Sequence, residues 1–235
     1  MKALAEPKTV ARLVLFDIDG TLIRTGGAGV AAFTRTGELA FQVPDGMRGL
    51  SFAGRTDTSL VREFFVGHGI EPSVANFERF FDHYVFLLDE LLPQHTGAVC
   101  PGVAGFLDGL RALSPAPLLG LQTGNIRLGA EIKLRHYGLW HHFELGGFGD
   151  DDEDRRRLTR VAWERAGRRF GGGLAPGEVL VVGDTPHDID CAHALGAKVL
   201  AVATGGSASQ ELAAHVPEWL VDDLNAISAA TVAGH

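Results

Sequence analysis

The stretch LVLFDIDGT, residues 13–21, decides the fold, because it joins an apolar run directly to a pair of acidic residues. A continuous apolar run as short as LVLF is typical of a strand buried on both faces of a parallel sheet. The run stops at Asp17, and Asp19 and Gly20 follow. We therefore expect a buried strand over residues 13–16 that presents two carboxylates at its carboxyl end.

Three later apolar runs have the same character, and each ends in a polar or glycine-rich turn. They are residues 118–122, 179–182 and 199–203. Helical patterns precede or follow them at residues 103–113, 126–137, 155–168 and 189–195. Strands that alternate with helices of this length indicate βαβ units. The chain is therefore predicted to be an α/β protein whose core is a Rossmann-like parallel sheet with helices on both faces.

The segment between the first two of these strands breaks the alternation, because it shows helical patterns without a convincing buried strand. The patterns cover residues 28–41, 58–68 and 74–92. In the last of them, aromatic and leucine residues recur at three- and four-residue spacing, which predicts one apolar face that packs in a core. Glycines near both ends of the segment favour turns there. The predicted domains are a core of residues 1–24 and 98–235 and an inserted α-helical cap of residues 25–97.

The composition excludes several classes of protein. Hydrophobic residues make up 46% of the chain and charged residues 21%, as in globular proteins. A net charge of −8 argues against a nucleic-acid partner, which requires a basic surface. No segment approaches the roughly 20 apolar residues of a membrane helix, and residues 1–10 lack the apolar run of a signal peptide. We expect a cytoplasmic protein with no membrane partner, in which Cys100 and Cys191 are reduced thiols.

Polar residues follow three of the predicted strands. They are Asp17 and Asp19, then Thr123, then Asp184 and Asp188. In an open parallel sheet, ligands bind outside the carboxyl ends of the strands, so these side chains are expected to meet in one crevice. Carboxylates that lie close together repel one another unless a cation is present. Oxygen ligands select a hard divalent ion, and Mg²⁺ is the cofactor that we predict.

The pair Asp17 and Asp19 is the most specific chemical signal in the chain. Gly20 allows the backbone to leave the extended form, so that both side chains can reach the crevice. One carboxylate can coordinate the metal and attack phosphorus, while the other protonates the leaving oxygen and later activates water. The pair therefore favours phosphoryl-transfer chemistry.

These motifs resemble those of a known family. FDIDGTL, residues 16–22, resembles the first motif of the haloacid dehalogenase-like hydrolases. TGN, residues 123–125, is similar to the second motif, and GDTPHDI, residues 183–189, to the fourth. GRTD, residues 54–57, and the order of the motifs resemble the phosphoglycolate-phosphatase-like branch. The resemblance extends from about Arg12 to Val221.

The resemblance implies roles for the acidic residues. Asp17 would be the nucleophile that forms an aspartyl-phosphate, and it would also bind Mg²⁺. Asp19 would be the general acid and base, with its main-chain carbonyl on the metal. Asp184 would complete the metal shell, and Asp188 would bind the metal or orient it, through water if not directly. Because the branch with an acid at the position of Asp19 consists mostly of phosphotransferases, the resemblance argues against dehalogenation.

The resemblance also implies how the phosphoryl group is held, and here one motif departs from the family. Thr123 would hydrogen-bond the phosphoryl group, helped by the main-chain N–H groups around Gly124 and Asn125. The third motif of the family usually offers a Lys in a Lys–Pro pair, but residues 149–155 read GDDDEDR. Two cations could replace this Lys: Lys133, which we favour as a catalytic residue because it is the only Lys between the second and fourth motifs, and Arg155. For each, a solvent-facing charge is the alternative.

In the cap, Arg55 is the candidate for contact with the substrate, and an ion pair with Asp57 is the alternative. The resemblance predicts an Mg²⁺-dependent phosphatase, a monomer or homodimer, that acts on a small phosphorylated metabolite, with phosphoglycolate as the default substrate. Two alternatives stay open: a phosphosugar mutase of the same family, and a non-catalytic phospho-acceptor or binding protein. Release of free phosphate separates the phosphatase from both.

Overall fold

The computed structural model describes residues 10–234. Residues 1–9, on which the expectation about a signal peptide mainly rests, and His235 lie outside the described residues. In the described part of the chain, no helix combines the length and the apolarity needed to cross a membrane.

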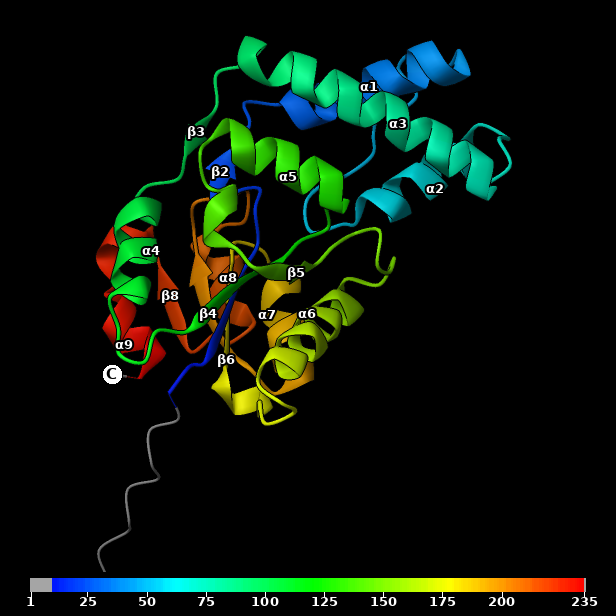
Figure 1. The fold of residues 1–235 in the computed structure, drawn as a ribbon. Coiled ribbons are helices and arrows are strands. Elements are labelled where there is room, and N and C mark those ends of the chain that lie inside the picture. Colours follow the sequence, from blue (N-terminus) through cyan, green and yellow to red (C-terminus); the bar gives the residue numbers. More distant parts are fainter. Residues whose placement is uncertain (1–9, 235) are drawn as a thin grey trace, which may run out of the picture.

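A six-stranded sheet in the order β5-β4-β1-β6-β7-β8 forms the centre of the protein, and all of its paired strands run parallel (Figure 1). The strands are β1 (Leu13–Phe16), β4 (Leu118–Gln122), β5 (Leu145–Gly147), β6 (Val179–Gly183), β7 (Lys198–Val202) and β8 (Trp219–Val221). The four strands predicted from apolar runs are present, with ends that differ by at most one residue. Phe16, the last residue of β1, lies beside Leu121 and Val182 in the register. The neighbouring strands therefore end level with Asp17.

Helices cover both faces of the sheet. They are α4 (Val103–Arg111), α5 (Arg127–His136) and α9 (Ala229–Ala233) on one face, and α6 (Arg155–Arg169), α7 (Pro186–Leu195) and α8 (Ser209–Ala214) on the other. Successive side chains of a strand point to opposite faces. Accordingly, Val14 and Phe16 lie in the apolar core that includes Phe106 of α4. Leu13 and Leu15 lie in the core that includes Ala162 of α6. The predicted fold class is confirmed.

The helical segment after β1 has an apolar core of its own. Its helices are α1 (Ala28–Phe41), α2 (Asp57–Gly67) and α3 (Val74–Leu91), which lie together at one end of the molecule (Figure 1). Phe33, Phe64 and Phe80 are buried in this core. The segment is entered through β2 (Ile23–Arg24) and left through β3 (Ala98–Val99), which pair antiparallel. We refer to α1–α3 and their loops as the cap; the domain boundaries at residues 25 and 97 stay a prediction.

The beginning of α2 attaches the cap to the end of the sheet. The N–H of Asp57 donates to the carbonyl oxygen of Gly124 at 2.7 Å. In return, the carboxylate of Asp57 accepts from the N–H of Ile126 at 2.9 Å. The guanidinium of Arg62 contacts Glu153 at 2.5 Å. These contacts hold the cap against the loops that follow β4 and β5, where the carboxyl ends of the strands lie.

Replacement of Phe80 tests the separate core of the cap. Phe80 is 0% exposed and its ring lies 5.3 Å from that of Phe33, whereas Phe86 on the same helix is 71% exposed. Phe80→Ala should lower the free energy of unfolding by about 3–5 kcal/mol, because it leaves a cavity in a packed core. Phe86→Ala should change it by about 0.5 kcal/mol or less. Urea unfolding measures both, and equal effects would contradict this account of the cap.

Candidate active site

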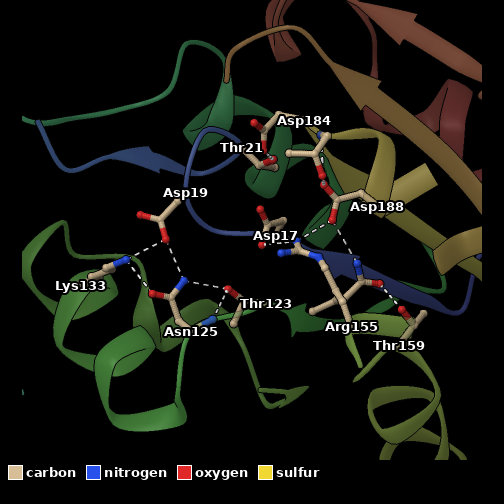
Figure 2. Close-up of polar contacts among 12 residues, drawn as sticks. Asp17, Asp19, Thr21, Thr123, Asn125, Lys133, Arg155, Thr159, Asp184 and Asp188 are labelled. Carbon is tan, nitrogen blue, oxygen red and sulfur yellow. Dashed lines mark hydrogen bonds and ion pairs between the residues drawn. The ribbon is translucent and has the colours of Figure 1, made fainter. Parts of the chain in front are cut away.

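The two acidic residues after β1 lie at the end of the sheet and point to different sides of the site (Figure 2). The N–H of Asp17 donates to the carbonyl oxygen of Val182 at 2.9 Å, which continues the strand pairing up to the carboxylate. Gly20 has φ +93°, and a Cβ there would lie 2.4 Å from Oδ2 of Asp184. Only glycine permits this backbone conformation together with so close an approach. The glycine thus lets the turn after Asp17 lie against Asp184.

Three buried carboxylates form one group. Asp17, Asp184 and Asp188 are 4%, 2% and 0% exposed. Each offers an oxygen, and these oxygens lie within 4.8 Å of one another. Asp184 follows β6 directly, and Asp188 lies in the first turn of α7. These three side chains therefore lie close together, as the sequence predicts. We call this group the acidic triad.

The acidic triad carries more negative charge than its surroundings offset. Burial raises the pKa of Asp17 to about 7; Arg155 acts in the opposite direction, and Asp188 and Asp19 raise the pKa further. Burial, followed by Asp17 and Asp188, raises the pKa of Asp184 to about 8. A bound cation would favour the ionised forms of these carboxyls. The acidic triad offers only oxygen atoms as ligands, without nitrogen or sulfur, and such a set fits a hard divalent ion such as Mg²⁺.

Asp188 differs from the other two carboxylates because both of its oxygens already accept hydrogen bonds. Oδ2 accepts from the N–H and the hydroxyl of Thr185 at 3.1 and 2.7 Å. Oδ1 accepts from Gln122 at 3.2 Å and from Arg155 at 2.7 Å. Four donors fill the acceptor sites of a carboxylate. Of the two roles predicted for Asp188, this arrangement favours orienting the site over binding a metal directly.

A second polar group surrounds Asp19, whose side chain is 42% exposed. Lys133 donates to Oδ2 of Asp19 at 2.7 Å and to Oδ1 of Asn125 at 2.6 Å. Asn125 donates to the same oxygen of Asp19 at 2.7 Å. Thr123, directly after β4, accepts from the side chain and the N–H of Asn125 at 2.9 and 3.2 Å. Figure 2 shows this group on one side of Asp17, with Arg155 on the other.

Both candidate cations lie inside the site. Lys133 is 4% exposed and Arg155 is 8% exposed, so the solvent-facing alternative is wrong for both. One nitrogen of Arg155 forms ion pairs with Asp17 at 2.9 Å and with Asp188 at 2.7 Å. Burial lowers the pKa of Arg155, but the charges of Asp17 and Asp188 raise it above its usual value. Arg155 contacts the predicted nucleophile, whereas Lys133 contacts the predicted proton donor.

The ion pair between Arg55 and Asp57, the alternative to contact with the substrate, is wrong. The guanidinium of Arg55 contacts Glu63 of α2 at 2.5 Å. The carboxylate of Asp57 instead accepts from Ile126, so it faces the sheet domain and not its neighbour Arg55. Burial raises the pKa of Asp57 to about 7, although Lys133 lowers it. Arg55 lines the same cavity as Asp17, and its contact with a substrate stays a prediction.

Several residues of the site were not identified from the sequence. Thr21 donates to Asp184 at 2.9 Å, and Thr159 of α6 donates to Gln122 at 2.5 Å. Thr185 was detectable, because Thr185 and Asp188 have the spacing of a capping box. Gln122 and Thr159 lie within otherwise ordinary strand and helix patterns. No spacing rule links them to the site.

Comparisons with known proteins identify the family of the chain. Residues 14–202 match the family described as haloacid dehalogenase-like hydrolase. The probable phosphatase IndB of Dickeya dadantii is 29% identical over 92% of this chain and 91% of its own length. A phosphoglycolate phosphatase of Chromobacterium violaceum is 29% identical over 86% of this chain and 90% of its own length. The tyrosine-protein kinase PtkA of Mycobacterium tuberculosis is 25% identical over 86% of this chain and 65% of its own length.

A solved structure has the same fold. CbbY from Rhodobacter sphaeroides, solved in complex with phosphate, superposes with a TM-score of 0.73 over 94% of this chain and 99% of its own. Its sequence identity of 17% means that this likeness concerns the fold alone. The family match covers most of the chain and includes the first, second and fourth motifs. The chain belongs to the haloacid dehalogenase-like hydrolases.

Proposed function

We propose that the protein is an Mg²⁺-dependent phosphatase that hydrolyses the phosphomonoester of a small molecule through an aspartyl-phosphate on Asp17. The observation that carries this proposal is the position of Asp17. It lies between the cation Arg155, at 2.9 Å, and a hydrogen-bonded group that contains a second acid, Asp19. This arrangement provides a nucleophile, a countercharge and a proton donor around one cavity. Phosphatases among the family relatives support the same reaction.

In the first step, a carboxylate oxygen of Asp17 forms a bond to phosphorus while the bond from phosphorus to the ester oxygen breaks. Asp19 gives a proton to the departing alkoxide. Oδ2 of Asp19 accepts from Lys133 and Asn125, which fixes the carboxyl group and leaves Oδ1 to carry the proton. The hydroxyl of Thr123 accepts twice from Asn125, so its hydrogen is available to a phosphoryl oxygen.

In the second step, Asp19 takes a proton from water, which attacks the phosphorus of the aspartyl-phosphate and releases free phosphate and Asp17. Arg155 offsets the negative charge of Asp17 and of the phosphoryl group throughout. Oxygens of Asp17 and Asp184 and the carbonyl of Asp19 would hold Mg²⁺, which would supply further positive charge to the phosphoryl oxygens.

Asp17→Asn should abolish phosphate release and phosphoenzyme formation, because an amide cannot replace the attacking carboxylate. The measurement is acid-quenched trapping of the phosphoenzyme by mass spectrometry, together with the assay of free phosphate from p-nitrophenyl phosphate. Asp89→Asn, at an exposed position of α3, is the matched control and should behave as the unmodified chain. Turnover by Asp17→Asn at the unmodified rate would rule out Asp17 as the nucleophile.

Asp19→Asn should slow both chemical steps by about 10²–10⁴-fold, the usual contribution of general acid–base catalysis. Rapid-quench measurements separate phosphoenzyme formation from its hydrolysis. A substrate whose alcohol leaves without a proton, such as p-nitrophenyl phosphate, should recover much of the first step but not of the second. A variant that keeps both rates for an alkyl ester would show that Asp19 transfers no proton.

Removal of divalent ions with a chelator should abolish phosphate release, and added Mg²⁺ should restore it, because Arg155 alone would then offset the charges of the buried acidic triad and of the phosphoryl group. Phosphate release is measured before chelation, after it, and after Mg²⁺ is returned. Full activity in excess chelator would contradict the metal dependence. If the phosphoryl group passed to a second alcohol without release of free phosphate, the reaction would be that of a mutase.

A further inference from the structure

The cavity that contains Asp17 has a volume of about 610 Å³ and extends from the sheet into the cap. Its sheet side carries the reactive groups described above. Its cap side is largely apolar, and we call the following residues the apolar wall: Val30, Phe33, Phe52, Ala53, Leu60 and the ring of Tyr84, whose buried hydroxyl has no hydrogen-bond partner in the described part of the chain. They come from α1, from α2, from α3 and from the loop between α1 and α2. A substrate that reaches Asp17 therefore has its alcohol part beside a hydrocarbon surface.

The cations that line the cavity already have acceptors within the protein. Arg24 donates to the carbonyl oxygen of Thr204 at 2.8 Å, and Arg55 contacts Glu63 at 2.5 Å. Lys133 contacts Asp19 at 2.7 Å, and Arg155 contacts two members of the acidic triad. A second anionic group on the substrate would have to compete with acidic partners for Arg55, Lys133 or Arg155, or lie beside Arg24, whose acceptor is a neutral carbonyl. Otherwise it would be buried without a countercharge, which is costly.

The size of the cavity also argues against a small substrate that carries a second charge. Its volume corresponds to roughly twenty water molecules. The two-carbon acid of phosphoglycolate would fill a small part of it and would leave the exposed and half-buried members of the apolar wall, Val30, Phe52 and Ala53, in contact with water. Burial of hydrocarbon against that wall would instead contribute favourable free energy for every apolar group removed from water.

Resting on the proposed phosphatase function, we propose that the substrate is a phosphomonoester of an uncharged, mainly apolar alcohol whose hydrocarbon part lies against the apolar wall. Such a ligand needs no cation beyond those that hold the phosphoryl group. It places its ester oxygen near Asp19 and its carbon skeleton under the cap helices.

Alkylphosphonates test this proposal, because their carbon–phosphorus bond is not hydrolysed and binding is then independent of turnover. Titration calorimetry with Mg²⁺ measures the affinity of the full chain for ethyl-, propyl-, butyl- and hexylphosphonate. The affinity should rise about fourfold for each added methylene. Propylphosphonate should bind more tightly than phosphonoacetate, which has a similar size and carries a carboxylate. Equal affinities along the series, or tighter binding of phosphonoacetate, would overturn the proposal.

Two valine-to-lysine variants, one in the apolar wall and one outside the cavity, form a matched pair. Val30 lines the cavity and is 45% exposed, whereas Val66 on α2 is 66% exposed and does not line it. Val30→Lys should weaken hexylphosphonate binding about fivefold, because it replaces an apolar contact, and should strengthen phosphonoacetate binding. Val66→Lys should leave both affinities unchanged. Equal effects of the two variants on hexylphosphonate would contradict the assigned position of the hydrocarbon.

Phosphate release from the corresponding alkyl phosphates separates this proposal from the one on which it rests. If the phosphonates bind with rising affinity but no ester releases phosphate, the ligand class stands and the phosphatase function fails. If esters are hydrolysed but the affinities stay flat, the phosphatase function stands and the apolar ligand fails.

Discussion

The repulsion among the carboxylates of Asp17, Asp184 and Asp188 is the constraint on which the rest of the site depends. Their oxygens lie within 4.8 Å of one another and all three side chains are buried. Such a group is stable in ionised form only with positive charge beside it. Arg155 provides one charge and contacts two of the three. The remaining imbalance is what makes the site suitable for a divalent cation and, next to it, a phosphoryl group.

Rigid elements of the fold hold these carboxylates close together. Asp17 and Asp184 follow the adjacent central strands β1 and β6, and Asp188 is held by Thr185, Gln122 and Arg155. Asp19 lies outside this buried group and belongs to a separate set of contacts with Lys133 and Asn125. In the proposed mechanism, the first set fixes the attacking carboxylate, and the second holds the residue that moves protons.

Much of this arrangement was predictable because its signals are local. Continuous apolar runs identified β1, β4, β6 and β7, and the parallel topology brings their ends together. The strands β5 and β8 were missed because each has only three residues, two of them glycine in β5. It was harder to predict which charged side chains contact one another. Arg55 contacts Glu63 instead of Asp57, and Lys133 and Arg155 both lie in the site. A sequence shows that charges exist, but packing decides which of them meet.

The central claim is that carboxylates from distant parts of the chain share one divalent cation beside the nucleophile. A crystal structure of the protein grown with Mg²⁺ tests it most directly. The account predicts one ion bonded to an oxygen of Asp17 and an oxygen of Asp184, at about 2.0–2.1 Å from each. Ordered side chains of Asp17 and Asp184 that bind no common ion would contradict it.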